Sequence, residues 1–298
     1  MAVLMKQIFG EILYTRNFHL SSIRILIIHS FPPCRKKKYH TGDARFIPAI
    51  MQKPTIIYCR SLKNISFSQS DFTLHGGESH IFYFPINDHS ISENHLNALT
   101  PAEREKVAKF RKTSDAELFI AARIFPKLIL QFYTRSKFKI IADEQNKPQI
   151  SISDPRETLC FNLSHTEGLL VIAISRTEVG IDAEFVKSPV PAGLKEECFS
   201  PAEQTLINTS DFPAETFYTL WTRKESLLKA DGAGLIDCLS ELEIHASRNK
   251  ASLSILFKYP TYCVTSFLLN NYVCSICNTS GNFEPLKIFD GGTLIKNL

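Results

Sequence analysis

Apolar residues recur at helical spacing across residues 215–231, and two glycines follow as a stop, so this segment is predicted to be an amphipathic helix. The apolar positions are Phe217, Leu220, Trp221, Leu227 and Leu228. Trp221, Glu225 and Lys229 stand four residues apart, so they form one row along the helix. Taken alone, this row is either a solvent-exposed Glu–Lys ion pair or one side of a functional site.

The remaining pattern predicts short strands and a few further helices. Strands are expected at 25–28, 81–86, 138–142, 169–175, 179–184, 242–244, 253–257, 262–269 and 272–277. A second long helix is expected at 115–133, capped by Ser114 and kinked at Pro126. Residues 81–175 and 176–277 therefore repeat one order of strand, helices and strands.

Two helix starts repeat the same local motif about one hundred residues apart. Thr100-Pro-Ala-Glu103 and Ser200-Pro-Ala-Glu203 both match a capping box with proline in the first turn. We therefore predict an α+β chain with a structural duplication. Its expected parts are a loosely packed N-terminal extension (1–77), a first subdomain (78–175) and a second subdomain (176–298). A ligand site is expected where the two subdomains meet.

Charge and composition narrow the classes of function. The formal net charge is +4, but residues 1–60 hold ten Lys/Arg and two Asp/Glu, so the remaining 24 bases and 28 acids leave a mildly acidic body. This balance does not favour nucleic-acid binding. No apolar run approaches the roughly 18 residues of a membrane span. The eight scattered cysteines fit a reducing, cytoplasmic compartment.

One pair of cysteines has the spacing of a redox or zinc half-site. Cys274 and Cys277 lie in a predicted strand, where positions three apart point to opposite faces. No second such pair follows it in the sequence. The sequence therefore does not favour a metal or redox role for this pair.

Two carboxylates form the first candidate site. Asp182 and Glu184 are two residues apart on an extended segment, so both point to the same side. They repel each other unless a cation lies between them or one is protonated. With Glu225 as a third oxygen donor, Mg²⁺ is the ion that fits such a site. An ordinary acidic strand end remains the alternative for Asp182 and Glu184.

Basic residues and one histidine form the second candidate site. The basic positions of the first helical region are Arg104, Lys106, Lys109, Arg111 and Lys112. They are either a solvated helix face or a phosphate clamp that Arg123 and Lys127 complete. His165 follows Ser164 at a strand end. It is either a structural residue or a cationic donor to a phosphate.

Two blocks together resemble a known signature. Gly180-Ile-Asp-Ala-Glu184, followed by Trp221-Thr-Arg-Lys-Glu-Ser-Leu-Leu-Lys229, resembles the motifs of the surfactin-type (Sfp-type) 4′-phosphopantetheinyl transferases. Asn146-Lys-Pro148, Phe161-Asn-Leu-Ser-His165 and Phe199-Ser-Pro-Ala-Glu203 are also similar to family blocks, and the resemblance covers roughly residues 80–277. Four residues depart from the family pattern. Asn146 replaces a usual glycine, Glu103 and Glu117 stand where members often carry bases, and Pro126 is unusual in its helix.

The resemblance implies an activity and a role for each candidate residue. Such enzymes move the phosphopantetheine arm of coenzyme A to a serine of an apo acyl or peptidyl carrier protein and release adenosine 3′,5′-bisphosphate. By analogy, Asp182, Glu184 and Glu225 bind Mg²⁺. Glu225 also takes the serine proton, directly or through water, and Lys229 assists the leaving group. The implied coenzyme A contacts are Lys106, Arg123, Lys147, Ser164, His165, Lys224 and Lys229.

The resemblance also implies an α+β fold of two similar subdomains in a pseudo-twofold arrangement, each a small antiparallel sheet packed with helices, acting as a monomer. It implies no nucleic-acid or membrane partner. Two other functions stay open. One is a non-catalytic relative that binds coenzyme A or a carrier protein, and the other is a different Mg²⁺-dependent phosphate enzyme such as a hydrolase. A third, weaker alternative is an interaction module in the basic stretch 35–38.

Overall fold

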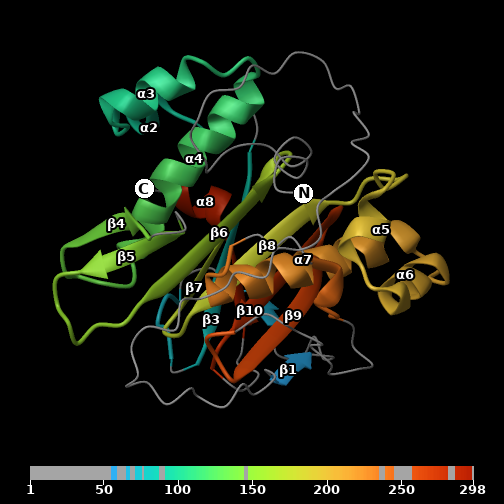
Figure 1. Ribbon diagram of the computed structural model, residues 1–298. Coiled ribbons are helices and arrows are strands. Elements are labelled where there is room, and N and C mark those ends of the chain that lie inside the picture. The colour runs from blue at the N-terminus through green and yellow to red at the C-terminus, as the bar shows by residue number, and fades with distance from the viewer. Residues whose placement is uncertain are drawn as a thin grey trace, which may run out of the picture.

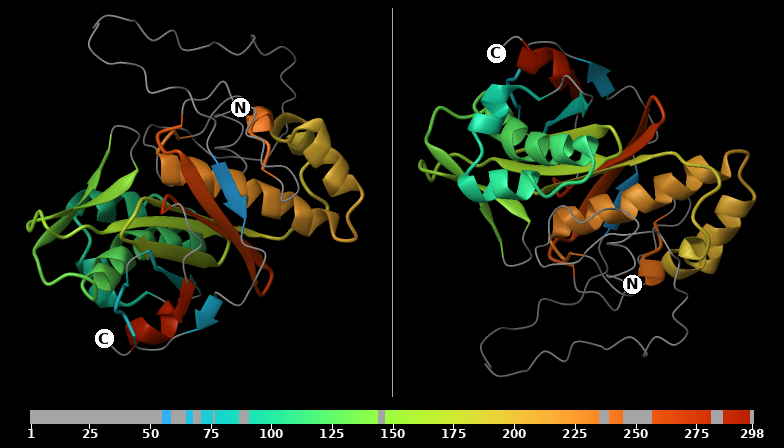
Figure 2. Two further views of the ribbon diagram at one scale, coloured as in Figure 1. Left: turned by 90° about the horizontal axis from the view of Figure 1, so that it is seen from below. Right: turned by 90° about the horizontal axis from the view of Figure 1, so that it is seen from above.

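Two β-sheets pack face to face, and a long helix covers the outer face of each (Figures 1 and 2). The computed structural model describes residues 55–58, 65–67, 71–75, 77–86, 91–143, 147–234, 239–244, 257–280 and 286–296. Within these ranges, every helix is too short or too polar to cross a bilayer. The α+β class predicted from the sequence is confirmed.

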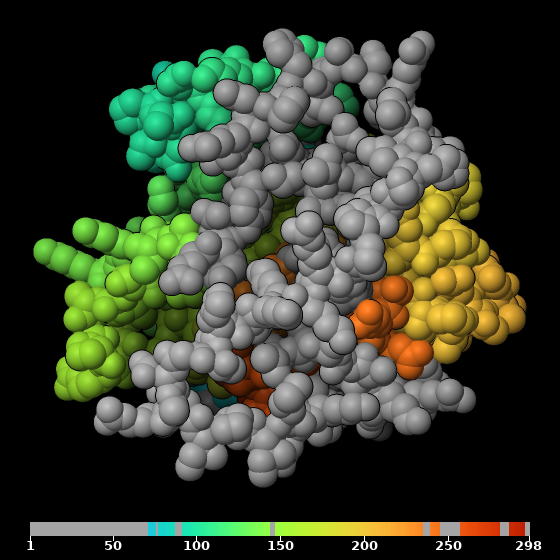
Figure 3. All heavy atoms as spheres, viewed as in Figure 1, coloured from blue at the N-terminus to red at the C-terminus, as the bar shows by residue number. Residues whose placement is uncertain are grey.

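One order of elements occurs twice along the chain. The first block contains β3 (Ser79–Pro85), α2 (Glu93–Asn97), α3 (Pro101–Val107), α4 (Thr113–Leu130), the hairpin β4 (Phe138–Ala142) and β5 (Pro148–Ile152), then β6 (Cys160–Thr166) and β7 (Leu169–Ser175). The second contains β8 (Val179–Phe185), α5 (Leu194–Cys198), α6 (Pro201–Asn208), α7 (Pro213–Asp231), the 3₁₀ turn η2 (Leu239–Glu241), β9 (Thr261–Leu269) and β10 (Tyr272–Asn278). In the space-filling view, α2 with α3 and α5 with α6 form separate flanks (Figure 3). This repetition is the duplication that the two capping motifs predict.

The sheets do not follow the predicted subdomain boundaries. The first has the order β2-β11-β3-β7-β6, in which β2 (Ile65–Phe67) and β11 (Leu286–Asp290) run parallel to each other. The second has the order β1-β9-β10-β8, with β1 (Thr55–Tyr58) parallel to β9. β1 and β2 come from the predicted N-terminal extension and β11 from near the C-terminus, and these three strands complete the two sheets. An open strand edge leaves unpaired backbone groups, which another strand can pair.

The C-terminal segment belongs with the first block rather than with the second. β11 pairs in parallel with β3, and α8 (Gly291–Lys296) follows it and packs on β3. Phe72 and Leu74 also pack in the core of the first block. The predicted subdomain boundaries therefore need correction. Residues before 78 and the segment 286–296 pack with the first block.

Three apolar clusters hold the layers together. One lies between α4 and the first sheet, one between α7 and the second sheet, and one between the two sheets. Residues on neighbouring positions of a strand enter different clusters, as the two-residue period of a strand requires. Cys274 packs between the sheets and Cys277 packs under α7, so the two thiols lie on opposite faces of β10 as predicted.

The capping boxes are formed in both blocks. Glu103 receives the backbone N–H of Thr100 at 2.9 Å, and Glu203 receives that of Ser200 at 3.0 Å. α7 ends at Gly232, whose φ of 73° is a left-handed conformation that glycine adopts at no steric cost. The other long helix begins at Thr113 with Lys112 as its N-cap and continues through Pro126, so the predicted Ser114 cap is wrong.

One predicted strand is wrong. Leu242 and Ile244 follow η2 in irregular backbone, and both are fully buried in the core of the second block. Their alternation arises because they anchor a loop under α7, not because they pair in a sheet. The strand predicted at 25–28 and residues 253–256 of the strand predicted at 253–257 lie outside the described residues, and Phe257 is in irregular backbone.

Lys224 is fully buried on the face of α7 that packs against α5 and α6. Its ammonium lies 2.7 Å from Glu203 Oε2 and donates to the carbonyls of Cys198 (2.8 Å) and Leu239 (3.1 Å). The other oxygen of Glu203 accepts the backbone N–H of Ile244 at 2.7 Å. One buried ion pair therefore ties α5, α6, η2 and the following loop to α7.

We expect Lys224→Met to lower the free energy of unfolding by about 3–5 kcal/mol, because it leaves the Glu203 carboxylate buried without its cation. Lys109→Met is the matched control. Lys109 pairs with Glu105 at 2.7 Å, but both side chains are about 70% exposed, so its loss should cost less than about 1 kcal/mol. Urea denaturation measures both values. Equal small losses would show that the buried pair does not stabilise the fold.

Candidate functional site

β8 carries two carboxylates on the face that looks toward α7. Val179, Ile181 and Ala183 point the other way, into the core between the sheets. The alternation leaves Asp182 and Glu184 on one side, as the strand period predicts. Asp182 is 4% exposed and Glu184 is half-buried.

Gly180 determines how closely α7 approaches this strand. A Cβ at this position would overlap the carbonyl oxygen of Ser226 and the backbone nitrogen of Ala230. The backbones of β8 and α7 are therefore in direct contact, which only glycine permits here. Glu225 and Lys229 flank this contact on α7, so the helix delivers both side chains to the carboxylates of β8.

Lys229 forms an ion pair with β8 rather than with its helical neighbour Glu225. Its ammonium lies 2.6 Å from Asp182 Oδ1 and also donates to Ser164 Oγ and to the carbonyl of Ile181, both at 3.2 Å. Although burial disfavours the ammonium, the charges of Asp182 and Glu225 raise the pKa of Lys229. The row predicted on this helix is thus not a solvent-exposed ion pair.

The carboxylates are short of compensating charge. Burial, and then the charge of Asp182, raise the pKa of Glu225 to about 7. Burial and the same neighbour raise the pKa of Glu184 well above its usual range. Asp182 Oδ2 and Glu225 Oε1 are buried without a hydrogen-bond partner among the described residues. Bare oxygens of this kind suit a hard divalent cation.

The spacing of these groups is not that of a closed metal centre. Across the described ranges, no cluster of three or more His, Cys, Asp or Glu side chains has a metal-binding arrangement. Lys229 instead places its ammonium against Asp182. The three acidic residues nevertheless include two buried oxygens without a partner in the described part of the chain, and a bound cation would relieve the energetic cost of burying them.

Strand β6 of the first block lies beside β8 (Figure 1). It carries Ser164 and His165. Ser164 Oγ donates to Asp182 Oδ1 at 2.8 Å. His165 is half-buried, and burial, followed by the charges of Lys229 and Arg123, lowers its pKa to about 4. The candidate site therefore lies between the two blocks, where the sequence places it.

Lys106 and Arg123 each contact the ring of Phe119. The Lys106 ammonium lies 5.1 Å and the Arg123 guanidinium 5.0 Å from the ring centroid, within the range of a cation–π contact. Arg123 Nε also lies 3.6 Å from Glu103 Oε1. The charge of Arg123 helps to lower the pKa of His165, so this base lies close enough to the histidine to interact with it.

Two of the predicted coenzyme A contacts lie apart from the carboxylates. Lys147 pairs with Glu178 at 2.8 Å, beside Cys160 where β6 begins. Lys224 donates three hydrogen bonds in the core and is fully buried. The Lys224 side chain is 0% exposed, whereas that of Lys229 is 29% exposed. A phosphate could therefore reach Lys229 but not Lys224, and Lys224 does not belong to the site.

Thr166 is not among the residues predicted from the sequence, yet it contacts one of the carboxylates. Its hydroxyl donates to Glu184 Oε2 at 3.2 Å. A signal was present, since Asn162, Ser164 and Thr166 are polar at every second position of β6, facing a strand that carries Asp182 and Glu184 at the same period. The matching periods on the two strands would have identified it.

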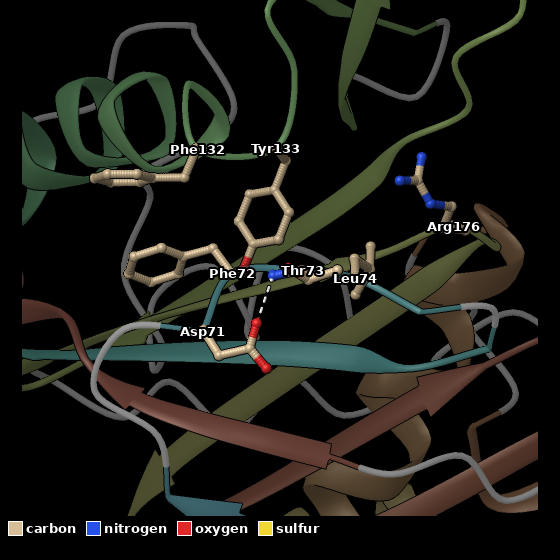
Figure 4. A pocket seen from close by; sticks show the side chains of 7 residues that line it. All are labelled: Asp71, Phe72, Thr73, Leu74, Phe132, Tyr133 and Arg176. Carbon is tan, nitrogen blue, oxygen red and sulfur yellow. Dashed lines mark hydrogen bonds between the residues drawn. The ribbon is translucent and has the colours of Figure 1, made fainter.

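A pocket of about 340 Å³ lies elsewhere in the first block and holds none of the predicted site residues (Figure 4). It is lined by Asp71, Phe72, Thr73, Leu74, Phe132, Tyr133 and Arg176. Its walls come from the segment before β3, the end of α4 and the residue after β7, so it is separate from the carboxylates of β8.

Comparisons with known proteins agree with this geometry. A model of the 4′-phosphopantetheinyl transferase superfamily matches residues 178–277, which run from the start of β8 to β10 and include α7. The chain is 25% identical over 200 residues to the 4′-phosphopantetheinyl transferase Sfp of Bacillus subtilis (strain 168), covering 64% of this chain and 87% of that protein.

Two further relatives carry the same description. The 4′-phosphopantetheinyl transferase HetI of Nostoc sp. is 28% identical over 182 residues, covering 58% of this chain and 76% of its own length. The 4′-phosphopantetheinyl transferase psf-1 of Bacillus pumilus is 29% identical over 184 residues, covering 59% and 76%. These similarities support a transferase that resembles the surfactin-type (Sfp-type) 4′-phosphopantetheinyl transferases.

Proposed function

We propose that the chain transfers the 4′-phosphopantetheine arm of coenzyme A to a serine hydroxyl of an apo acyl or peptidyl carrier protein and releases adenosine 3′,5′-bisphosphate. The observation that carries the proposal is the cluster of Asp182, Glu184 and Glu225 around the Lys229 ammonium at the junction of the two blocks. A pyrophosphate is the part of coenzyme A that needs both a divalent cation and a lysine.

Asp182, Glu184 and Glu225 would hold Mg²⁺ in this proposal. Their oxygens are the ligand type that Mg²⁺ takes, and two of them are buried without a partner in the described part of the chain. When bound, the ion would neutralise charge on the pyrophosphate as the phosphorus–oxygen bond to the leaving group breaks.

Glu225 is the proposed base. Its Oε1 is buried without a hydrogen-bond partner among the described residues, so it is available to accept a proton. It would take the proton of the serine hydroxyl while the serine oxygen attacks the phosphorus of the arm. Lys229 would turn from Asp182 to the pyrophosphate and stabilise the departing adenosine 3′,5′-bisphosphate.

The 3′-phosphate would lie against the first block. His165, Arg123 and Lys106 are the donors there, and Ser164 adds a hydroxyl that is already bonded to Asp182. Lys147 remains a proposed contact on the adenine side, at the Cys160 end of β6. We place the enzyme in the cytoplasm, since Cys274 and Cys277 are free thiols, and we propose a monomer, as the resemblance implies.

Incubation with coenzyme A, Mg²⁺ and an apo carrier protein should add the mass of one phosphopantetheine arm to the carrier. Asp182→Ala and Glu225→Gln should each lower the rate by roughly 100-fold or more. The first removes a ligand of the ion that neutralises charge in the transition state, and the second removes the proposed base. Glu105→Gln, an exposed glutamate on α3, is the matched control and should keep the wild-type rate. Mass spectrometry of the carrier measures the rate of transfer by the wild type and by each of the three variants.

Circular dichroism should show that both active-site variants remain folded. Full transfer by either folded variant would contradict the roles given to these carboxylates. Absence of transfer by the wild type across fatty-acid, polyketide and peptide carriers would contradict the proposed function as a whole. Coenzyme A binding without transfer would instead favour a non-catalytic relative.

The stability of the protein should fall as the pH drops from 6.5 toward 4, in part because of His165. Its pKa is lowered from 6.5 to about 4 on folding. Below pH 6.5 the unfolded chain therefore binds a proton at this residue that the folded chain does not, which favours unfolding. His165→Gln should flatten the dependence of the melting temperature on pH in this range. His75→Gln, which removes an exposed histidine, is the control, and an unchanged slope for His165→Gln would refute the prediction.

A further inference from the structure

Strands β6 and β8 are edge strands of different sheets, and they lie side by side at the junction of the two blocks (Figure 1). A side chain fixes their register. Asn162 Oδ1 on β6 accepts the backbone N–H of Ile181 on β8 at 3.0 Å, and both residues are buried. Because side chains on a strand repeat every two residues, the positions that follow on both strands come opposite one another in step.

Two hydroxyls on β6 meet the two carboxylates of β8 in this register. Ser164 Oγ donates to Asp182 Oδ1 at 2.8 Å, and Thr166 Oγ1 donates to Glu184 Oε2 at 3.2 Å. Each hydroxyl binds one oxygen of its carboxylate and thereby orients the other. The first block thus supplies donors that set the direction of acids belonging to the second.

We propose that Thr166 is a positioning residue that holds Glu184 in the orientation needed to bind the metal ion. The proposal rests on the function proposed above, in which both acids are metal ligands. Groups that hydrogen-bond to metal ligands fix their geometry and usually change metal affinity by about 10–100-fold when removed.

Thr166 is suited to this task. A β-branched side chain has few rotamers, so its hydroxyl points in a defined direction from a strand. Glu184 has a long and flexible side chain and is one residue from the end of β8, where it is half-buried. A fixed donor opposite a flexible acceptor limits the conformations that the acceptor can adopt before metal arrives.

Thr166→Val tests the proposal, because valine keeps the shape of threonine and removes the donor. Binding of Mn²⁺ to the protein without substrate, measured by electron paramagnetic resonance, should weaken by about 10-fold. The Mg²⁺ concentration for half-maximal transfer should rise in parallel, while the rate at saturating Mg²⁺ stays near that of the wild type. Thr166→Ser, which restores the hydroxyl, should bind Mn²⁺ within about twofold of the wild type.

Thr265→Val is the matched control, since Thr265 is a buried threonine on β9 that stands opposite Ile276. It should bind Mn²⁺ like the wild type. If Thr166→Val also binds Mn²⁺ like the wild type, the positioning role is refuted. Transfer by the wild type would still support the proposed function. The role is equally refuted if Thr166→Ser is as weak as Thr166→Val, because the hydroxyl then does not matter. A wild type that binds no Mn²⁺ and transfers nothing would refute the proposed function and this role together.

Discussion

The contact between α7 and β8 at Gly180 is the constraint on which the candidate site depends. Any side chain at this position would overlap the backbone of Ser226 and Ala230. With glycine there, the helix lies directly on the strand, so Glu225 and Lys229 reach the carboxylate of Asp182. A helix held farther away, as packing through side chains usually requires, would leave these groups separated by solvent. The smallest residue in the motif therefore sets the geometry of the charged ones.

That geometry concentrates negative charge where water is scarce. Three carboxylates share the space with one ammonium, so burial and mutual repulsion raise the pKa of Glu184 and Glu225. A fold gains no stability from such an arrangement, because each unpaired buried charge costs free energy. Sites of this kind are usual where a protein acts on a charged ligand. This cost is offset elsewhere by the three apolar cores.

Patterns in the sequence predicted the features that depend on residues close together along the chain. Helical spacing located α7, the period of two placed Asp182 and Glu184 on one face, and the capping motifs marked α3 and α6. The sequence did not predict contacts that depend on tertiary packing. The parallel pairing of β11 with β3 joins residues about two hundred positions apart. The direction in which Lys224 points follows from which face of α7 meets α6, a feature that spacing along one helix cannot reveal.

The duplication explains why two similar bases have different surroundings. In each block, the glutamate of a capping box faces a base on the following long helix. Glu103 lies 3.6 Å from Arg123, which remains about 30% exposed, whereas Glu203 lies 2.7 Å from Lys224 in a fully buried pair. The ion pair is thus partly exposed to solvent in the first block and fully buried in the second. Arg123 can still turn to an anion at the junction, while Lys224 is committed to the core. One repeated motif therefore forms a partly exposed ion pair in the first block, where we propose that Arg123 contacts a phosphate, and a fully buried ion pair in the second.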